Sequence, residues 1–135
     1  MLITGRCYCG DLKYEVEGEP QFTAQCHCRE CQYLTGGAPN IFMVMPKNTF
    51  QYNEGKAKGF ARSDLDNPVT REFCSNCGTH ILTKSNSMPD AVIIKVGSMD
   101  DLTLFEGPQM AIFCEDKQAF HTVPEGVPEY DKFPG

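Results

Sequence analysis

Seven of the eight cysteines lie in three tight clusters, and their spacing constrains this 135-residue chain more than any other feature. The clusters are Cys7-Tyr8-Cys9, Cys26-His27-Cys28-Arg29-Glu30-Cys31 and Cys74-Ser75-Asn76-Cys77. A Cys-x-Cys pair and a Cys-x-x-Cys pair together supply four thiolates, which is a closed tetrahedral shell for zinc. The middle cluster supplies three, and a zinc ion with three protein ligands keeps one position open for chemistry. The spacing therefore predicts two zinc ions, one structural and one reactive.

The first and third clusters each run directly into a glycine, Gly10 and Gly78. A zinc knuckle needs a turn that points backbone N–H groups at sulfur, and the positive φ angle of that turn is easiest for glycine. We expect these two clusters to share the structural zinc through Cys7, Cys9, Cys74 and Cys77. The alternative is that one pair is an inert or redox-active dithiol.

The middle cluster places Cys26, Cys28 and Cys31 within six residues, so all three can face one ion from a single turn. Three thiolates weaken zinc as a Lewis acid and suit it to hold one more soft ligand, such as a substrate thiol. A bound thiol would lose its proton and act as a nucleophile toward an electrophilic carbon. The alternative is closure of the site by Cys114, which lies in an apolar segment where a buried inert thiol is the default.

The three histidines are weaker candidates for the site. His27 lies between two ligands, and in an extended Cys-x-Cys its side chain points away from the metal, so hydrogen bonding nearby is the favoured interpretation. His80 follows the third cluster, and a structural role is favoured there as well. His121, in the C-terminal segment, is a candidate for lining a pocket.

Composition limits the partners. With 18 acidic and 12 basic residues the net charge is −6, which disfavours nucleic acid as a partner because that binding depends on neutralising phosphates. The longest apolar runs, such as 41–45, are far too short to span a membrane. The N-terminus has no apolar segment typical of a signal peptide, so we expect a cytoplasmic protein. In a reducing compartment clustered cysteines favour metal ligation over the alternatives, disulfides or redox chemistry.

Short strand signals recur along the chain, and no segment of ten residues carries a helical apolar pattern. We expect one mainly β domain over residues 1–135, with little helix. The turn residues at 53–55 predict that 50–52 and 58–62 form a hairpin, and the proline-rich tail from Val123 should be irregular. Strands are predicted at 12–17, 41–45, 50–52, 58–62, 70–73, 79–84, 91–96 and 110–114. The strands at 70–73 and 79–84 flank the third cysteine pair and are predicted to form a hairpin.

Taken as a set, the clusters resemble those of the glutathione-dependent formaldehyde-activating enzymes and their centromere protein V-like relatives. The matching motifs are Gly5-Arg6-Cys7-Tyr8-Cys9-Gly10, the middle cluster quoted above and Phe73-Cys74-Ser75-Asn76-Cys77-Gly78. The chain has no tryptophan, and Ala111 stands where family members often carry a histidine.

The resemblance implies a β-tent of short antiparallel strands around zinc knuckles. It also implies a catalytic zinc held by Cys26, Cys28 and Cys31, and condensation of glutathione with formaldehyde to S-hydroxymethylglutathione, which in reverse is a carbon–sulfur lyase reaction. Arginines near the motifs are candidates for binding the carboxylates of glutathione: Arg29, Arg62 and Arg71. The alternative function is a non-catalytic, zinc-stabilised binding module.

Overall fold

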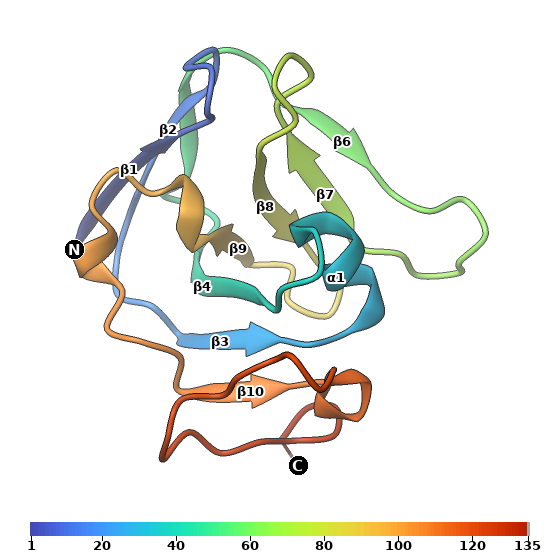
Figure 1. The fold of residues 1–135 in the computed structure, drawn as a ribbon. Helices are drawn as coiled ribbons and strands as arrows, with labels where there is room; N and C mark the ends of the chain where they lie inside the picture. The colour runs from blue at the N-terminus through green and yellow to red at the C-terminus, as the bar shows by residue number, and fades with distance from the viewer. Residues whose placement is uncertain (135) are drawn as a thin grey trace.

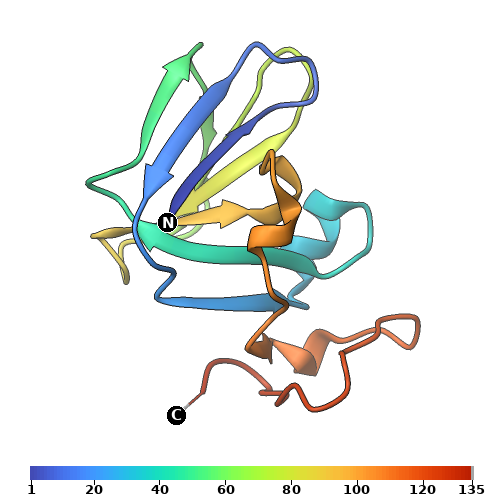
Figure 2. The ribbon, with the colours of Figure 1, turned by 90° about the vertical axis from the view of Figure 1, so that its left-hand side faces the viewer.

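The computed structural model describes residues 1–134, which form two β-sheets and one short α-helix. The sheets lean against each other, as Figures 1 and 2 show from two sides. The smaller sheet has the strand order β1-β2-β5 and the larger one the order β10-β3-β4-β9-β8-β7-β6. The mainly β architecture expected from the sequence is confirmed.

The smaller sheet is antiparallel throughout and consists of β1 (Leu2–Arg6), β2 (Lys13–Glu17) and β5 (Gln51–Glu54). Alternate residues of β2 face the core, so Tyr14 and Val16 are buried while Lys13 and Glu17 are exposed. This is the period of two that the sequence shows. β1 was not expected from the sequence.

The larger sheet is antiparallel except at one edge, where β10 runs parallel to β3. The expectation of antiparallel strands is wrong at this edge, because a long connection carries the chain back to the start of β3 and allows parallel pairing. The strands are β3 (Phe22–Cys26), β4 (Asn40–Pro46), β6 (Lys58–Phe60), β7 (Thr70–Phe73), β8 (His80–Lys84), β9 (Ala91–Lys95) and β10 (Met110–Ile112).

The predicted hairpin between 50–52 and 58–62 is wrong. β5 pairs with β2 in the smaller sheet, whereas β6 pairs with β7 in the larger one. Aromatic packing explains the difference, since the Phe50 ring stacks on Tyr14 at a centroid distance of 5.4 Å and meets Tyr52 at 5.0 Å. Burial of these rings against β2 holds β5 in the smaller sheet, and the chain then crosses to the other sheet.

The helix α1 (Arg29–Thr35) has only seven residues and follows β3 directly. Its N-cap is Cys28, whose Sγ accepts a hydrogen bond from the N–H of Cys31 at 3.3 Å. Its C-cap is Gly36 in the left-handed conformation, a common helix end. In place of the usual serine, threonine or aspartate, a cysteine caps the helix.

Three short 3-10 turns lie in the last third of the chain, at Val96–Ser98, Leu102–Leu104 and Cys114–Asp116. The tail beyond residue 123 contains no named strand up to residue 134, as expected. It nevertheless packs beside β10, because the N–H of Ala111 donates to the carbonyl of Pro128 and the N–H of Tyr130 donates to that of Ala111. Figure 1 shows this segment below β3.

The buried side chains form two clusters, and each contains cysteines of a different group. The cluster between the two sheets includes Cys7 and Cys74, and the cluster around β3 and β4 includes Cys26 and Cys31. Each group of cysteines is therefore part of a packed core.

Gly5, the first glycine of the N-terminal motif, lies where the backbone passes close to the core. A Cβ at this position would be 2.3 Å from Tyr14 Cζ and 2.4 Å from the carbonyl oxygen of Ser98. The Tyr14 hydroxyl is held in place by a 2.7 Å hydrogen bond to Ser98 Oγ, so the ring cannot easily move away.

We therefore predict that Gly5→Ala lowers the free energy of unfolding by about 1–3 kcal/mol through overpacking. Denaturant unfolding of the metal-loaded protein measures this. Gly97→Ala is the matched control, because a Cβ at Gly97 would have nothing within 4 Å and the side chain would be exposed. Equal stability of the two variants would show that the close approach at Gly5 does not matter.

Candidate metal centres

The four-cysteine group joins two turns that are far apart in the sequence. Cys7 and Cys9 lie between β1 and β2, and Cys74 and Cys77 lie between β7 and β8. All four Sγ atoms are within 4.8 Å of one another, with 3.6 Å between Cys7 and Cys9 and 3.7 Å between Cys9 and Cys74. Four sulfurs at the Zn–S bond length of about 2.3 Å in a tetrahedron are about 3.8 Å apart. The donor set therefore fits a tetrahedral zinc ion.

The two turns of this group have matching backbone geometry. Gly10 and Gly78 have φ angles of +85° and +81°, which confirms the expectation of a positive φ after each pair. Their N–H groups donate to the carbonyls of Cys7 and Cys74 at 3.1 and 2.8 Å. The N–H of Leu12 points at Cys7 Sγ, 3.2 Å away. Such N–H···S contacts stabilise the thiolate form that a metal requires.

The three-cysteine group lies where β3 passes into α1. Cys26 ends the strand, Cys28 caps the helix and Cys31 lies in its first turn. Their Sγ atoms are within 4.8 Å of one another, and among residues 1–134 no further cysteine, histidine, aspartate or glutamate joins the group. Three donors from one short segment fit a metal ion with one coordination position left open.

Cys114, the candidate for closing this site, lies outside the group. The strand expected over 110–114 ends at Ile112, and Phe113 takes up a left-handed conformation with φ of +53°. This turn places Cys114 at the start of a 3-10 segment, where its N–H donates to the carbonyl of Tyr130. Closure by Cys114 is therefore not the arrangement observed.

The three thiols differ in their environments. Hydrogen bonds from Cys26 and Cys28 lower the pKa of the Cys31 thiol to about 3, whereas contacts with Cys28 and Cys31 raise the pKa of Cys26 above its usual range. The side-chain amide of Asn40 adds a contact to Cys31 Sγ at 3.7 Å. Negative charge is thus most favourable at Cys31, inside the core.

Lys95, at the end of β9, is a buried cation beside this group that sequence reasoning missed. The residue is only 7% exposed, and its ammonium lies over the Phe42 ring, 5.4 Å from the centroid. Burial lowers the pKa of Lys95 to about 8, while negative charge on Cys31 acts in the opposite direction. The sequence indicates this buried cation only by the position of Lys95, a charged residue that directly follows the apolar run Ala91–Ile94.

The side chain of His27 points away from the cysteines, as expected, and is fully buried. Its Nδ1 lies 2.9 Å from Nδ1 of His121, whose Nε2 lies 2.7 Å from the carbonyl oxygen of Gly37. That carbonyl requires a proton on Nε2 of His121, so Nδ1 of His121 accepts, both from His27 and from the N–H of Gln118 at 3.1 Å. Burial lowers the pKa of His27, which agrees with a neutral pair. The two histidines join the C-terminal segment to the turn after β3.

His80 also lies outside both cysteine groups. Its Nε2 is 3.2 Å from the carbonyl of Leu82 and 3.3 Å from the Thr83 hydroxyl. Burial is the main cause that lowers its pKa to about 3, so the ring is neutral near pH 7. A structural role, the favoured interpretation, agrees with these contacts.

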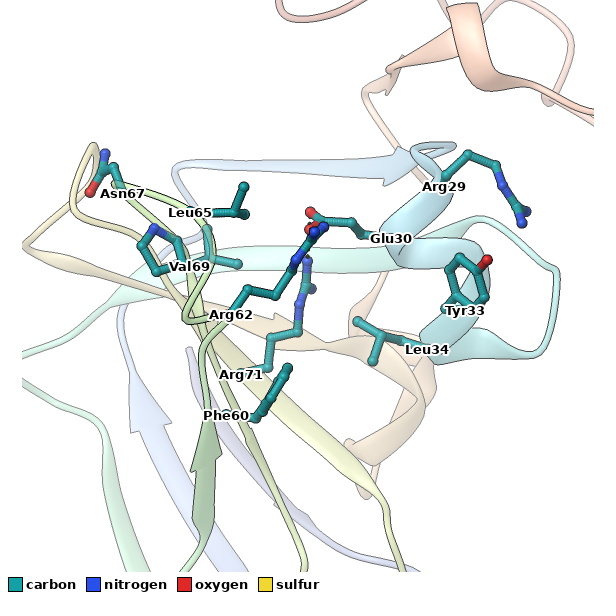
Figure 3. A pocket seen from close by; sticks show the side chains of 11 residues that line it. Arg29, Glu30, Tyr33, Leu34, Phe60, Arg62, Leu65, Asn67, Val69 and Arg71 are labelled. Atoms are coloured by element: carbon teal, nitrogen blue, oxygen red, sulfur yellow. Dashed lines mark hydrogen bonds and ion pairs between the residues drawn. The ribbon is translucent and has the colours of Figure 1, made fainter.

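The three arginines singled out in the sequence line one cavity of about 410 Å³ beside α1. Figure 3 shows Arg62 and Arg71 directed toward Glu30 of the helix, with Arg29 on the far side of α1. Glu30 accepts hydrogen bonds from Arg62 at 3.4 Å and from Arg71 at 3.5 Å. Arg29 lies over the Tyr33 ring at 4.9 Å. The three arginines are brought to one cavity only by the tertiary fold, because they come from segments that are separate in the sequence.

The fold and the two cysteine groups define a mainly β protein with two candidate metal sites. A family model described as glutathione-dependent formaldehyde-activating enzyme matches residues 2–116, and the chain belongs to this family. The fold is similar to the crystal structure of a Rhodobacter sphaeroides protein from a structural genomics programme, with 18% identity and a TM-score of 0.60. That match covers 96% of this chain and 100% of the other.

A comparison with curated proteins gives no significant match. Within residues 1–134, no helix has the length and apolar character needed to cross a membrane.

The histidine pair generates a prediction on stability. His121→Ala removes the acceptor of the buried His27 N–H, and an unpaired buried donor costs about 1–3 kcal/mol. Denaturant unfolding at full metal loading should show this loss. Thr122→Ala is the control, because the Thr122 side chain is exposed. If both variants unfold at the same denaturant concentration, the histidine contact is not stabilising.

Proposed function

We propose that the protein is a zinc-dependent enzyme that joins a small thiol to an electrophilic carbon, and that in reverse it acts as a carbon–sulfur lyase. Glutathione and formaldehyde are the first candidates, which the family name supports. The observation that carries the proposal is the group of Cys26, Cys28 and Cys31, three sulfurs within 4.8 Å with no fourth protein ligand among the described residues. A zinc ion bound by these three sulfurs would keep one coordination position for a substrate, whereas the four-cysteine group has no such position.

When bound at this group, zinc would supply an open position that takes up a substrate thiol and favours its thiolate form. The protein holds the three sulfurs rigidly, because Cys26 and Cys31 are in the core and Cys28 is fixed as a helix cap. The cap hydrogen bond from the N–H of Cys31 to Cys28 Sγ favours the thiolate that a metal ion would require.

The reaction moves one proton from sulfur to oxygen overall. The thiol sulfur forms a bond to the carbonyl carbon, the C=O π electrons move to oxygen, and the oxygen takes up a proton as the thiol loses one. Negative charge thus develops near a group that is already negative. Lys95 is placed to offset it, because its ammonium is buried beside the three sulfurs.

The group of Cys7, Cys9, Cys74 and Cys77 has a different proposed role. Its four donors fill the coordination shell, which leaves no position for a substrate. A zinc ion here would contribute to folding, because its ligands come from both sheets. We propose two zinc ions per chain, one structural and one catalytic.

Paired cysteine variants test this division. We predict that the protein binds two zinc ions, that Cys31→Ser binds one and stays folded, and that Cys74→Ser loses most of its stability. Metal analysis measures zinc content, and circular dichroism measures folding and stability. Exchange NMR with ¹³C-formaldehyde and glutathione measures the rate of adduct formation. Adduct formation should fall to the uncatalysed rate in Cys31→Ser.

Two results would contradict the proposal. One is a fully loaded protein that does not accelerate adduct formation from any small thiol, and the other is an unchanged rate in Cys31→Ser. Either would favour the alternative, a non-catalytic zinc-stabilised module.

The role of Lys95 is tested with a charge-conserving pair. Lys95→Met should lower kcat by about a hundredfold, because it removes a cation that stabilises developing negative charge. Lys95→Arg should restore part of the rate. Zinc content is measured in both variants, so that loss of metal is separated from loss of charge. Equal kcat in the methionine variant and the unchanged protein would exclude this role.

A further inference from the structure

Two adjoining cavities, of about 410 and 440 Å³, lie between α1 and the strands β6 and β7. They share Leu34, Phe60 and Arg71 as lining residues and so form one continuous groove. We call it the arginine groove. Its volume is in the range typical of small-molecule sites. None of the cysteines lines either cavity, so the groove adjoins the proposed catalytic site through α1 but does not include its sulfurs.

The walls of the groove are largely apolar and yet uncovered. Phe60 is 56% exposed, Leu34 45% and Leu65 42%, and all three line the first cavity. Figure 3 shows Leu34 on the helix and Phe60 across from it. Large apolar side chains gathered at one hollow and bordered by charged groups mark a binding site, because leaving them in water costs free energy.

The charge in the groove comes mainly from arginine. Arg29, Arg62 and Arg71 line the first cavity, and Arg62 is already paired with Asp64 at 2.6 Å. Among the described residues that line the two cavities, Glu30 alone is acidic. The Arg71 side chain is only 14% exposed, and its one ion pair within residues 1–134 is a long contact of 3.5 Å to Glu30. A guanidinium has five N–H donors and prefers shorter, paired contacts with a carboxylate. Arg71 is therefore poorly satisfied by Glu30 alone.

We propose that the arginine groove binds a small amphiphilic carboxylate, with its apolar body against Phe60 and Leu34 and its carboxylate on Arg71. The ligand carboxylate replaces Glu30 as the partner of Arg71. The exposed apolar walls fit a body more hydrophobic than that of a peptide thiol such as glutathione. The proposal goes beyond the proposed reaction and does not depend on it.

A ligand in the groove would affect the position of the three-cysteine group. Glu30 lies in the sequence between Cys28 and Cys31, and all three belong to the first turn of α1 or its cap. A ligand that displaces Glu30 and packs on Leu34 therefore contacts the helix that holds two of the three sulfurs.

The test is a titration of the metal-loaded protein with 4-phenylbutyrate, followed by ¹H–¹⁵N NMR and calorimetry. Two control ligands separate the two parts of the site: 4-phenylbutan-1-ol lacks the charge, and butyrate lacks the apolar body. We expect 4-phenylbutyrate to shift amide signals of α1, β6 and β7, and to bind about tenfold or more tightly than either control.

Variants locate the binding. Arg71→Gln and Phe60→Ser should each weaken 4-phenylbutyrate binding about tenfold, while Arg6→Gln, an arginine outside the groove, should leave it unchanged. Because Phe60 is exposed, the Phe60→Ser variant keeps the test valid if Arg71→Gln does not fold.

No binding of 4-phenylbutyrate at millimolar concentration would overturn the proposal, as would equal affinity for the alcohol or amide shifts confined to other surfaces. None of these results bears on the proposed reaction, which is tested by zinc content and adduct formation.

Discussion

The structure depends most on the place where the four-cysteine group brings the two sheets together. Its ligands come from the β1–β2 turn of the smaller sheet and the β7–β8 turn of the larger one, which Figure 1 shows at the same end of the molecule. A direct hydrogen bond from the N–H of Tyr8 to the Thr79 hydroxyl, 2.9 Å long, joins the same two turns. With one end of both sheets fixed, the core between them has a defined shape. A metal ion bound at this point would add its binding free energy to folding.

The second cysteine group belongs to the other packed cluster, the one around β3 and β4. It lies at the end of β3, where the strand passes into a short helix, and the buried Lys95 is close enough for the charge of these cysteines to affect its pKa. The histidine pair on the opposite side of the same segment secures the turn after β3 with the C-terminal chain. The middle cluster thus has one side with three cysteines, the candidate metal site, and a structural side with His27, because alternate residues of an extended segment point in opposite directions.

Local sequence signals predicted much of the fold. Strand β7 and its hairpin with β8 follow from residue pattern and the knuckle between them, and both glycines after the cysteine pairs have the expected positive φ. The pairing of β5 with β2 could not be predicted from the local sequence, because it depends on the packing of Phe50 against Tyr14 and Tyr52 in the folded protein. Helix α1 was also missed, since seven residues with a cysteine cap carry too little periodicity.

The site was predictable only in part, for the same physical reason. Cysteine spacing indicates the members of each cluster, and the number of thiolates per cluster indicates that the first and third share one ion. The position of Lys95 beside the sulfurs, the contact of His27 with His121 and the gathering of the arginines each join segments far apart in the sequence. Such contacts depend on sheet order, which a single sequence does not specify.

The most direct test of the account is a crystal structure of the zinc-loaded protein grown with a small thiol, with anomalous data at the zinc edge. The account predicts two zinc ions, one bound by Cys7, Cys9, Cys74 and Cys77 and one by Cys26, Cys28 and Cys31 with the added thiol as its fourth ligand. A single zinc ion in fully loaded protein, or a second zinc closed by a protein side chain, would contradict it.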